Sequence, residues 1–169
     1  MAEEATTESV GGADTPFDLS SSTQQLTELG IPTITSIDTL KANADTLWDN
    51  QNYTDAAAAY AKYAKQVNWF ANISSSGLEP YYGASYDDRK DFSPTQFSVY
   101  DLSSYENASN SYKTERNRAI LYEGLCYYHL GDYTSALPLL IKALDLIDIQ
   151  DEVNWKVGME ALYAIIGYK

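Results

Sequence analysis

The chain is poor in the residues from which metal and catalytic centres are built. It has one cysteine, Cys126, and one histidine, His129, among 169 residues. A single cysteine excludes a disulfide within the chain and a zinc site built from cysteines. A single histidine excludes a metal site with two histidines, and no Gly-x-Ser-x-Gly motif supplies a nucleophile to work with that ring. We therefore expect no cofactor and no enzymatic activity.

Positive charge and long apolar runs are also scarce. Eleven Lys and Arg residues stand against 24 Asp and Glu, which gives a net charge of −13. Such a field repels nucleic acid, and no basic stripe opposes it, so we predict that nucleic acid is not a partner. No run of 18 or more apolar residues occurs, so we expect no insertion into a membrane.

Apolar residues are rare at the start of the chain. Residues 1–35 are rich in Ser, Thr, Gly and acids and contain no base, whereas the whole chain is 44% hydrophobic. A segment of that composition cannot bury enough surface to offset its conformational entropy. We predict a disordered acidic tail over residues 1–35 and a folded domain over residues 36–169. The tail is either an ordinary disordered terminus or a spacer.

Against these absences stands one internal repeat. Two segments 80 residues apart place a large apolar, a small, a large, an alanine and a large residue at the same intervals: Leu40, Ala44, Leu47, Ala56 and Tyr60, then Ile120, Gly124, Tyr127, Ala136 and Leu140. The small residues let two helices cross closely. This spacing resembles the tetratricopeptide repeat (TPR) over residues 36–70 and 117–168.

The resemblance has departures that both copies share. Asn43 and Glu123 stand where the family usually has Leu, and Asn68 and Asp148 stand where it usually has Pro. A third partial copy begins at Trp155 and continues with Met159, Leu162 and Tyr168; an alternative register takes Gly158 as its small residue.

The resemblance implies an all-α fold of TPR-like antiparallel helix pairs with about five main helices. We expect them over residues 37–50, with Ser36 as N-cap, then 54–71, from a point between 103 and 111 to 130, 133–147 and 151–166. The register tolerates Pro138 only near the first turn of its helix. Between the pairs lies an insert, residues 72–115, with the rings Tyr81, Tyr82, Tyr86, Phe92, Phe97 and Tyr100. So many rings predict that the insert folds back onto the helices.

The family register also predicts which side chains line a concave groove. They are Lys41, Asp45, Trp48 and Asp49 in the first copy, and Leu121, Tyr122, Leu125, Tyr128 and His129 in the second. Aromatic and apolar surface with a few charges suits an extended peptide or a partner helix. We therefore predict a scaffold for protein–protein interaction that binds a peptide or protein partner in or beside this groove.

Two other functions remain open at this point. The first is a ligand-binding module of a bacterial cell envelope, in which the aromatic insert binds carbohydrate or peptide; few Lys and many Tyr, Ser, Thr and Asn residues favour a bacterial exterior. The second is a structural module that associates with itself through the last helix, which has apolar residues on two sides. One row is Trp155, Met159, Leu162 and Ile166, and beside it lie Val153, Val157, Ala161 and Ile165.

Overall fold

The computed structural model describes residues 20–76, 78–85, 87–88 and 99–168. The chain divides into two units, Met1–Ile31 and Pro32–Lys169. In the first unit the described residues form helix α1 (Ser20–Leu29), in which the Gln24 amide donates to Glu28 one turn later at 2.8 Å. A helix therefore occupies ten residues of the segment 1–35 that was predicted as a disordered tail. Residues 1–19 of that segment lie outside the described residues.

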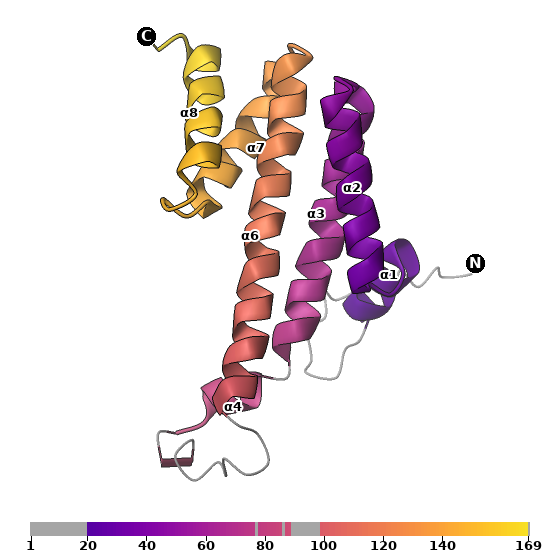
Figure 1. Ribbon diagram of the computed structural model, residues 1–169, viewed down its shortest axis with the longest axis vertical. Helices are drawn as coiled ribbons and strands as arrows, with labels where there is room; N and C mark the ends of the chain where they lie inside the picture. Colours follow the sequence, from indigo (N-terminus) through magenta and orange to yellow (C-terminus); the bar gives the residue numbers. More distant parts are fainter. Residues whose placement is uncertain (1–19, 77, 86, 89–98, 169) are drawn as a thin grey trace, which may run out of the picture. The chain divides into compact units, whose positions relative to one another are not determined.

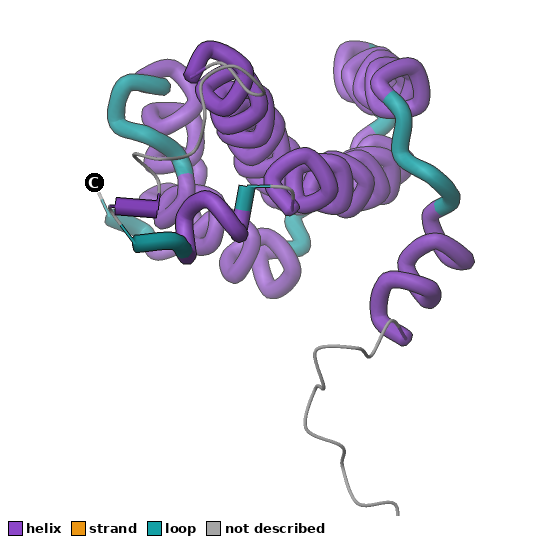
Figure 2. Tube along the Cα trace, turned by 90° about the horizontal axis from the view of Figure 1, so that it is seen from below, coloured by secondary structure: helices purple, strands orange, loops and turns teal. Residues whose placement is uncertain are grey.

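The second unit is a series of packed helices. They are α2 (Ile34–Asp49), α3 (Tyr53–Ser76), α4 (Glu79–Gly83), α6 (Val99–His129), α7 (Tyr133–Leu146) and α8 (Glu152–Ile166). In Figure 1, α2, α3 and α6 lie side by side, and α7 lies between α6 and α8. Over the described residues the chain consists of helix and connecting loop without a strand (Figure 2). The all-α prediction is confirmed at this level.

Helix α2 begins one turn earlier than expected. Its N-cap is Thr33, whose side chain accepts a hydrogen bond from the Ser36 backbone N–H at 3.1 Å, while the Ser36 hydroxyl accepts from the Thr33 N–H at 2.9 Å. Two N–H groups that a helix start leaves without partners are satisfied by this reciprocal pair. The prediction of Ser36 as N-cap was therefore wrong, because Ser36 occupies the third helical position of the capping box.

The helices cross at the small residues of the repeated spacing. Ala44, Ala56 and Ala136 are fully buried. A Cβ atom at Gly124 would lie 3.1 Å from Leu140 Cδ2, and one at Gly158 would lie 2.9 Å from Leu121 Cδ1. Gly158 follows Gly124 by 34 residues. In the third partial copy, the buried small residue of α8 is therefore Gly158, as in the alternative register.

Two turns of the second unit repeat each other bond for bond. Asn52 N–H donates to Leu47 O at 2.9 Å, and 80 residues later Asp132 N–H donates to Tyr127 O at 3.0 Å. The residue before each donor has a positive φ, 58° at Gln51 and 76° at Gly131. The two copies therefore share backbone geometry at this turn even though only the second uses glycine, the residue that adopts this conformation without strain.

The segment 72–115 is more helical than the sequence indicated. Helix α3 continues to Ser76, and α6 begins at Val99 and runs unbroken to His129. The buried Ser109 hydroxyl donates to Ala71 O at 3.1 Å, and the rings of Phe70 and Tyr112 meet edge to face at 4.6 Å between centroids. The first half of α6 thus packs on the end of α3.

Most of the insert's rings, which were predicted to fold back onto the helices, lie outside the described residues. Leu78 is buried and Tyr82 is exposed. Residues 86, 92 and 97, and the side chains of residues 81 and 100, lie outside the described residues. None of the helices described is long and apolar enough to span a lipid bilayer.

Candidate functional site

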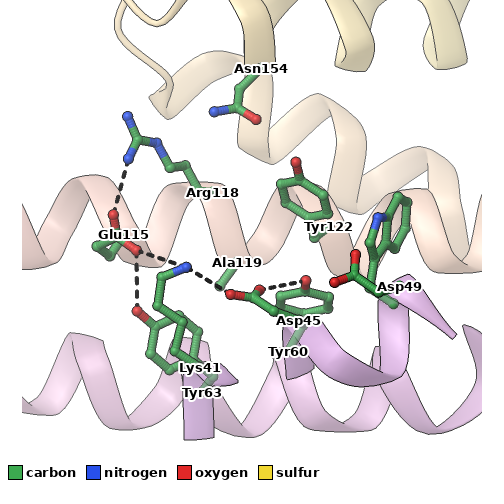
Figure 3. A pocket seen from close by; sticks show the side chains of 11 residues that line it. Lys41, Asp45, Asp49, Tyr60, Tyr63, Glu115, Arg118, Ala119, Tyr122 and Asn154 are labelled. Carbon is green, nitrogen blue, oxygen red and sulfur yellow. Dashed lines mark hydrogen bonds and ion pairs between the residues drawn. The ribbon is translucent and has the colours of Figure 1, made fainter. Parts of the chain in front are cut away.

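A polar cavity lies where α2, α3, α6 and α8 meet. Its volume is about 380 Å³, and the residues that line it are Lys41, Asp45, Trp48, Asp49, Tyr60, Tyr63, Glu115, Arg118, Ala119, Tyr122 and Asn154. On α2, α3 and α6, successive lining residues are mostly three or four apart, so each of these three helices turns one of its faces toward the cavity. Figure 3 shows their side chains.

An alternating row of charges crosses the cavity from α2 to α6. The Lys41 ammonium lies 3.0 Å from Asp45 Oδ2 and 3.8 Å from Glu115 Oε2, so it bridges two carboxylates on two helices (Figure 3). Glu115 Oε1 in turn lies 3.0 Å from Arg118 Nη1. Charges that satisfy one another in this way fix their side chains for recognition.

Two tyrosines of α3 hold the carboxylates from beneath. The Tyr60 hydroxyl donates to Asp45 Oδ1 at 2.9 Å, and the Tyr63 hydroxyl donates to Glu115 Oε2 at 3.3 Å. Burial, together with the adjacent carboxylate in each case, raises the pKa of both hydroxyls well above the ordinary tyrosine value. Both therefore stay protonated and act as donors over the whole physiological range.

Arg118 connects α6 to the start of α8. Its Nε atom donates to Asp151 Oδ2 at 2.8 Å, and Asn154 Nδ2 donates to Asp151 Oδ1 at 3.0 Å. Burial by itself would raise the pKa of Asp151, but the hydrogen bonds from Arg118 and Asn154 outweigh it and lower that pKa below its usual value. Asp151 is not itself a lining residue, but it holds the two lining side chains Arg118 and Asn154 in place. It is the N-cap residue of α8, where the helix dipole also favours negative charge.

Three groups in the cavity remain open to a ligand. Asp49 forms no hydrogen bond or ion pair with the rest of the described chain, and the Tyr122 hydroxyl forms no hydrogen bond there. Figure 3 shows that hydroxyl directed toward the side of the cavity where Asn154 lies. Beside Asp49, the half-buried Trp48 ring contacts Tyr122 edge to face at 5.0 Å. The cavity therefore offers a free carboxylate, a free hydroxyl and an aromatic surface.

Five of the nine residues predicted to line a groove do line this cavity: Lys41, Asp45, Trp48, Asp49 and Tyr122. Leu121 and Leu125 do not, because both are buried in the core, Leu121 against Gly158 of α8. Tyr128 and His129 also lie elsewhere. His129 stacks on Tyr53 at 4.6 Å and contacts Trp48 and Tyr128, so these rings form an aromatic cluster at the end of the cavity.

The lining residues that the sequence did not predict are Tyr60, Tyr63, Glu115, Arg118, Ala119 and Asn154. The signal that could have found those on α6 is helical spacing. Glu115, Arg118 and Tyr122 are three and four residues apart and follow one face of a helix. Cys126 is fully buried in the core, and burial raises the pKa of its thiol to about 12.

No protein-family model matches the chain, and no curated protein or solved structure shows significant similarity to it. Among the described residues no three His, Cys, Asp or Glu side chains are grouped so that they could hold a metal ion. The function of the cavity must therefore be inferred from its own geometry.

Proposed function

We propose that this chain is a TPR-like scaffold that binds an extended peptide segment of a protein partner in the cavity between α2, α6 and α8, and that it is not an enzyme. The observation that carries the proposal is the origin of the cavity walls. The helices α2, α6 and α8 contain the corresponding small residues Ala44, Gly124 and Gly158, and all three helices contribute to this one cavity.

The chemistry of the cavity supports a peptide as the occupant. An extended peptide offers alternating N–H and C=O groups, and the Tyr122 hydroxyl, which forms no hydrogen bond within the described chain, can donate to one and accept from the other. The Asp49 carboxylate beside the Trp48 ring suits a Lys or Arg side chain of the partner, which gains an ion pair and a cation–π contact together. The net charge of −13 attracts such a basic segment at long range.

Selection of a random peptide library on the full chain tests the proposal. Selected peptides should be enriched in Lys or Arg and should bind Asp49→Asn about tenfold more weakly, since one charge-assisted contact is lost. Asp38→Asn is the matched control, because Asp38 is an exposed acid on the same helix that does not line the cavity. Peptides that bind both variants equally, or no enrichment at all, would contradict the proposal.

Of the two alternatives, one has an observation in its favour. Helix α8 buries Gly158 and Ala161, but Val153 and Val157 are 73% and 41% exposed. This apolar row supports self-association through the last helix as a second function. The envelope-module alternative depends on the aromatic insert, most of whose ring side chains lie outside the described residues, and no observation favours it.

A further inference from the structure

A second cavity lies between α3, α6 and α7, on a different face of α6 from the first. Its volume is about 480 Å³. Its apolar wall is built from Ala61 and Ala64 of α3, Ile120 of α6 and Leu139 of α7. None of the residues of the first cavity lines this one. The two sites are therefore separate, and a ligand of the second cavity does not depend on the peptide binding proposed for the first.

Three basic side chains line this second cavity: Lys65, Arg116 and Lys142. They are three of only eleven in an acidic chain. No carboxylate of the described residues forms an ion pair with any of them; Lys62 and Lys113 likewise have none, whereas Lys41, Arg118 and Lys156 do. With three basic side chains and one acidic one, Glu123, the cavity has a local excess of positive charge in a protein of net charge −13, and such an excess attracts an anion.

Arg116 is held in place without losing its charge. Its Nη1 atom donates to Asn68 Oδ1 at 2.7 Å, while Nε and Nη2 donate to Asn117 Oδ1 at 3.0 and 2.9 Å. Asn117 is itself fixed, because its amide donates to Leu146 O at 2.8 Å. These acceptors are all neutral, and a guanidinium has five N–H groups, so it keeps two donors and its full charge for a ligand.

Two of the four departures from the repeat pattern lie at this cavity. Glu123, where the family pattern has Leu, and Asn68, where it has Pro, both line it. An apolar side chain at position 123 would extend the core here, but the chain has polar groups at both places. Glu123 is the one carboxylate among the described lining residues, and burial raises its pKa although Lys65 and Lys142 lower it.

We propose that this cavity binds a small amphiphilic monoanion, with its acidic head held by Arg116, Lys65 and Lys142 and a short aliphatic tail against Ile120 and Leu139. The three cations set against Glu123 leave an excess of positive charge for the head. A bare inorganic anion fits the cavity less well, because it would leave the apolar wall in contact with water. Removal of the competing carboxylate in Glu123→Gln should strengthen binding.

Calorimetric titration of the full chain with octanoate tests this assignment. Octanoate should bind at one site per chain and more tightly than acetate, which lacks the tail, or 1-octanol, which lacks the charge. Lys65→Gln should weaken octanoate binding about tenfold, whereas Lys62→Gln, an exposed lysine of the same helix outside the cavity, should leave it unchanged. Amide chemical shifts of α3, α6 and α7 should move on titration.

Several results would overturn the assignment. The assignment fails if Lys65→Gln binds octanoate as tightly as wild type does. It also fails if wild type binds octanoate and 1-octanol equally, or if the chemical-shift changes are confined to residues of the first cavity. If Lys65→Gln proves unstable, the salt dependence of wild-type binding replaces it. The affinity for octanoate must then fall with rising salt while that for 1-octanol does not, since only the charged head is screened.

Discussion

At the scale of single residues, the fold depends on side chains that are absent or minimal. Ala44, Ala56 and Ala136 have no exposed surface, and Gly124 and Gly158 have core leucines where a Cβ would stand. Interiors are close-packed, so each of these positions lacks room for further carbon atoms. Where the chain needs close helix approach, the size of the residue therefore decides more than its hydrophobicity.

Ala136→Leu tests this dependence on size. Extra carbons between α6 and α7 should lower the free energy of unfolding by about 1–3 kcal/mol through overpacking. Urea denaturation of wild type and variant measures the loss. Ala58→Leu is the control, because Ala58 is exposed in α3 and leucine is nearly as good a helix former. Equal midpoints for Ala136→Leu and wild type would show that the crossing is not as described.

The Asp151 carboxylate makes the chain sensitive to acid. Its lowered pKa means that its contribution to stability is present above the unfolded value, about 3.9, and is lost as pH falls through the lower folded value. Asp151→Asn should therefore destabilise the chain at about pH 7, and the difference from wild type should shrink at about pH 3. Urea titrations at both pH values measure this. Asp145→Asn, an exposed acid of α7 that forms no hydrogen bond or ion pair within the described chain, is the control and should leave the stability at about pH 7 unchanged.

At the scale of elements, α7 contains a defect. Pro138 is the sixth residue of α7, in its second turn. A proline there has no N–H to donate to the carbonyl of Thr134 four residues earlier, and its ring crowds that carbonyl. The N-cap residue Asp132 accepts a hydrogen bond from the Ser135 N–H at 3.1 Å. This bond stabilises the first turn of α7, before the hydrogen bond that Pro138 lacks.

Pro138→Ala should remove the defect. Because Pro138 is exposed, the change costs little packing, and the restored hydrogen bond should raise the free energy of unfolding by about 1–3 kcal/mol. Thermal unfolding followed by circular dichroism gives the change in Tm. An unchanged or lowered Tm would indicate that α7 needs the bend of a proline to reach its neighbours.

Elements and part of the site could be predicted because they depend on local spacing. The small crossing residues and the α2 wall of the cavity follow from intervals of three and four residues within one helix. The rest depends on contacts between helices. Leu121 is buried against Gly158 of α8 and not free to line the cavity, and Tyr60 reaches Asp45 only because α3 packs against α2.

Other features could not be predicted because the sequence is compatible with more than one local structure. Thr33 and Ser36 are both good N-caps, and the geometry of the loop before α2 selects the first. The polar stretch from Asn107 to Ser111 has no apolar periodicity, yet it lies in α6. The bond from Ser109 to Ala71 O and the contact of Tyr112 with Phe70 supply the tertiary support that this stretch lacks by itself.

At the scale of the whole second unit, α8 leaves apolar surface uncovered. Val153 and Val157 of α8 are 73% and 41% exposed, and Ile149, in the turn before α8, is 71% exposed. Exposed apolar surface of this kind is typical of an interaction surface. We expect the chain to self-associate reversibly as its concentration rises.

Sedimentation velocity over a range of concentrations tests this expectation. Val153→Asp should shift the chain toward monomer without changing its Tm, because Val153 is exposed and supports no core contact. Tyr105→Asp, an exposed ring on α6, is the matched control and should leave the association unchanged. A wild type that stays monomeric at every concentration would rule out self-association through this helix.

The order in which the helices pack has a consequence for cooperativity. Helix α2 packs on α3, α3 on α6, α6 on α7, and α8 on both α7 and α6, so most interfaces join neighbours in the chain. The stability of such an arrangement is close to a sum of terms for adjacent elements. Unfolding then begins at α2 or α8, each of which has fewer neighbours than α6. The interface of α3 with α6, which both cavities share, would be the last to open, and its amide protons would exchange most slowly.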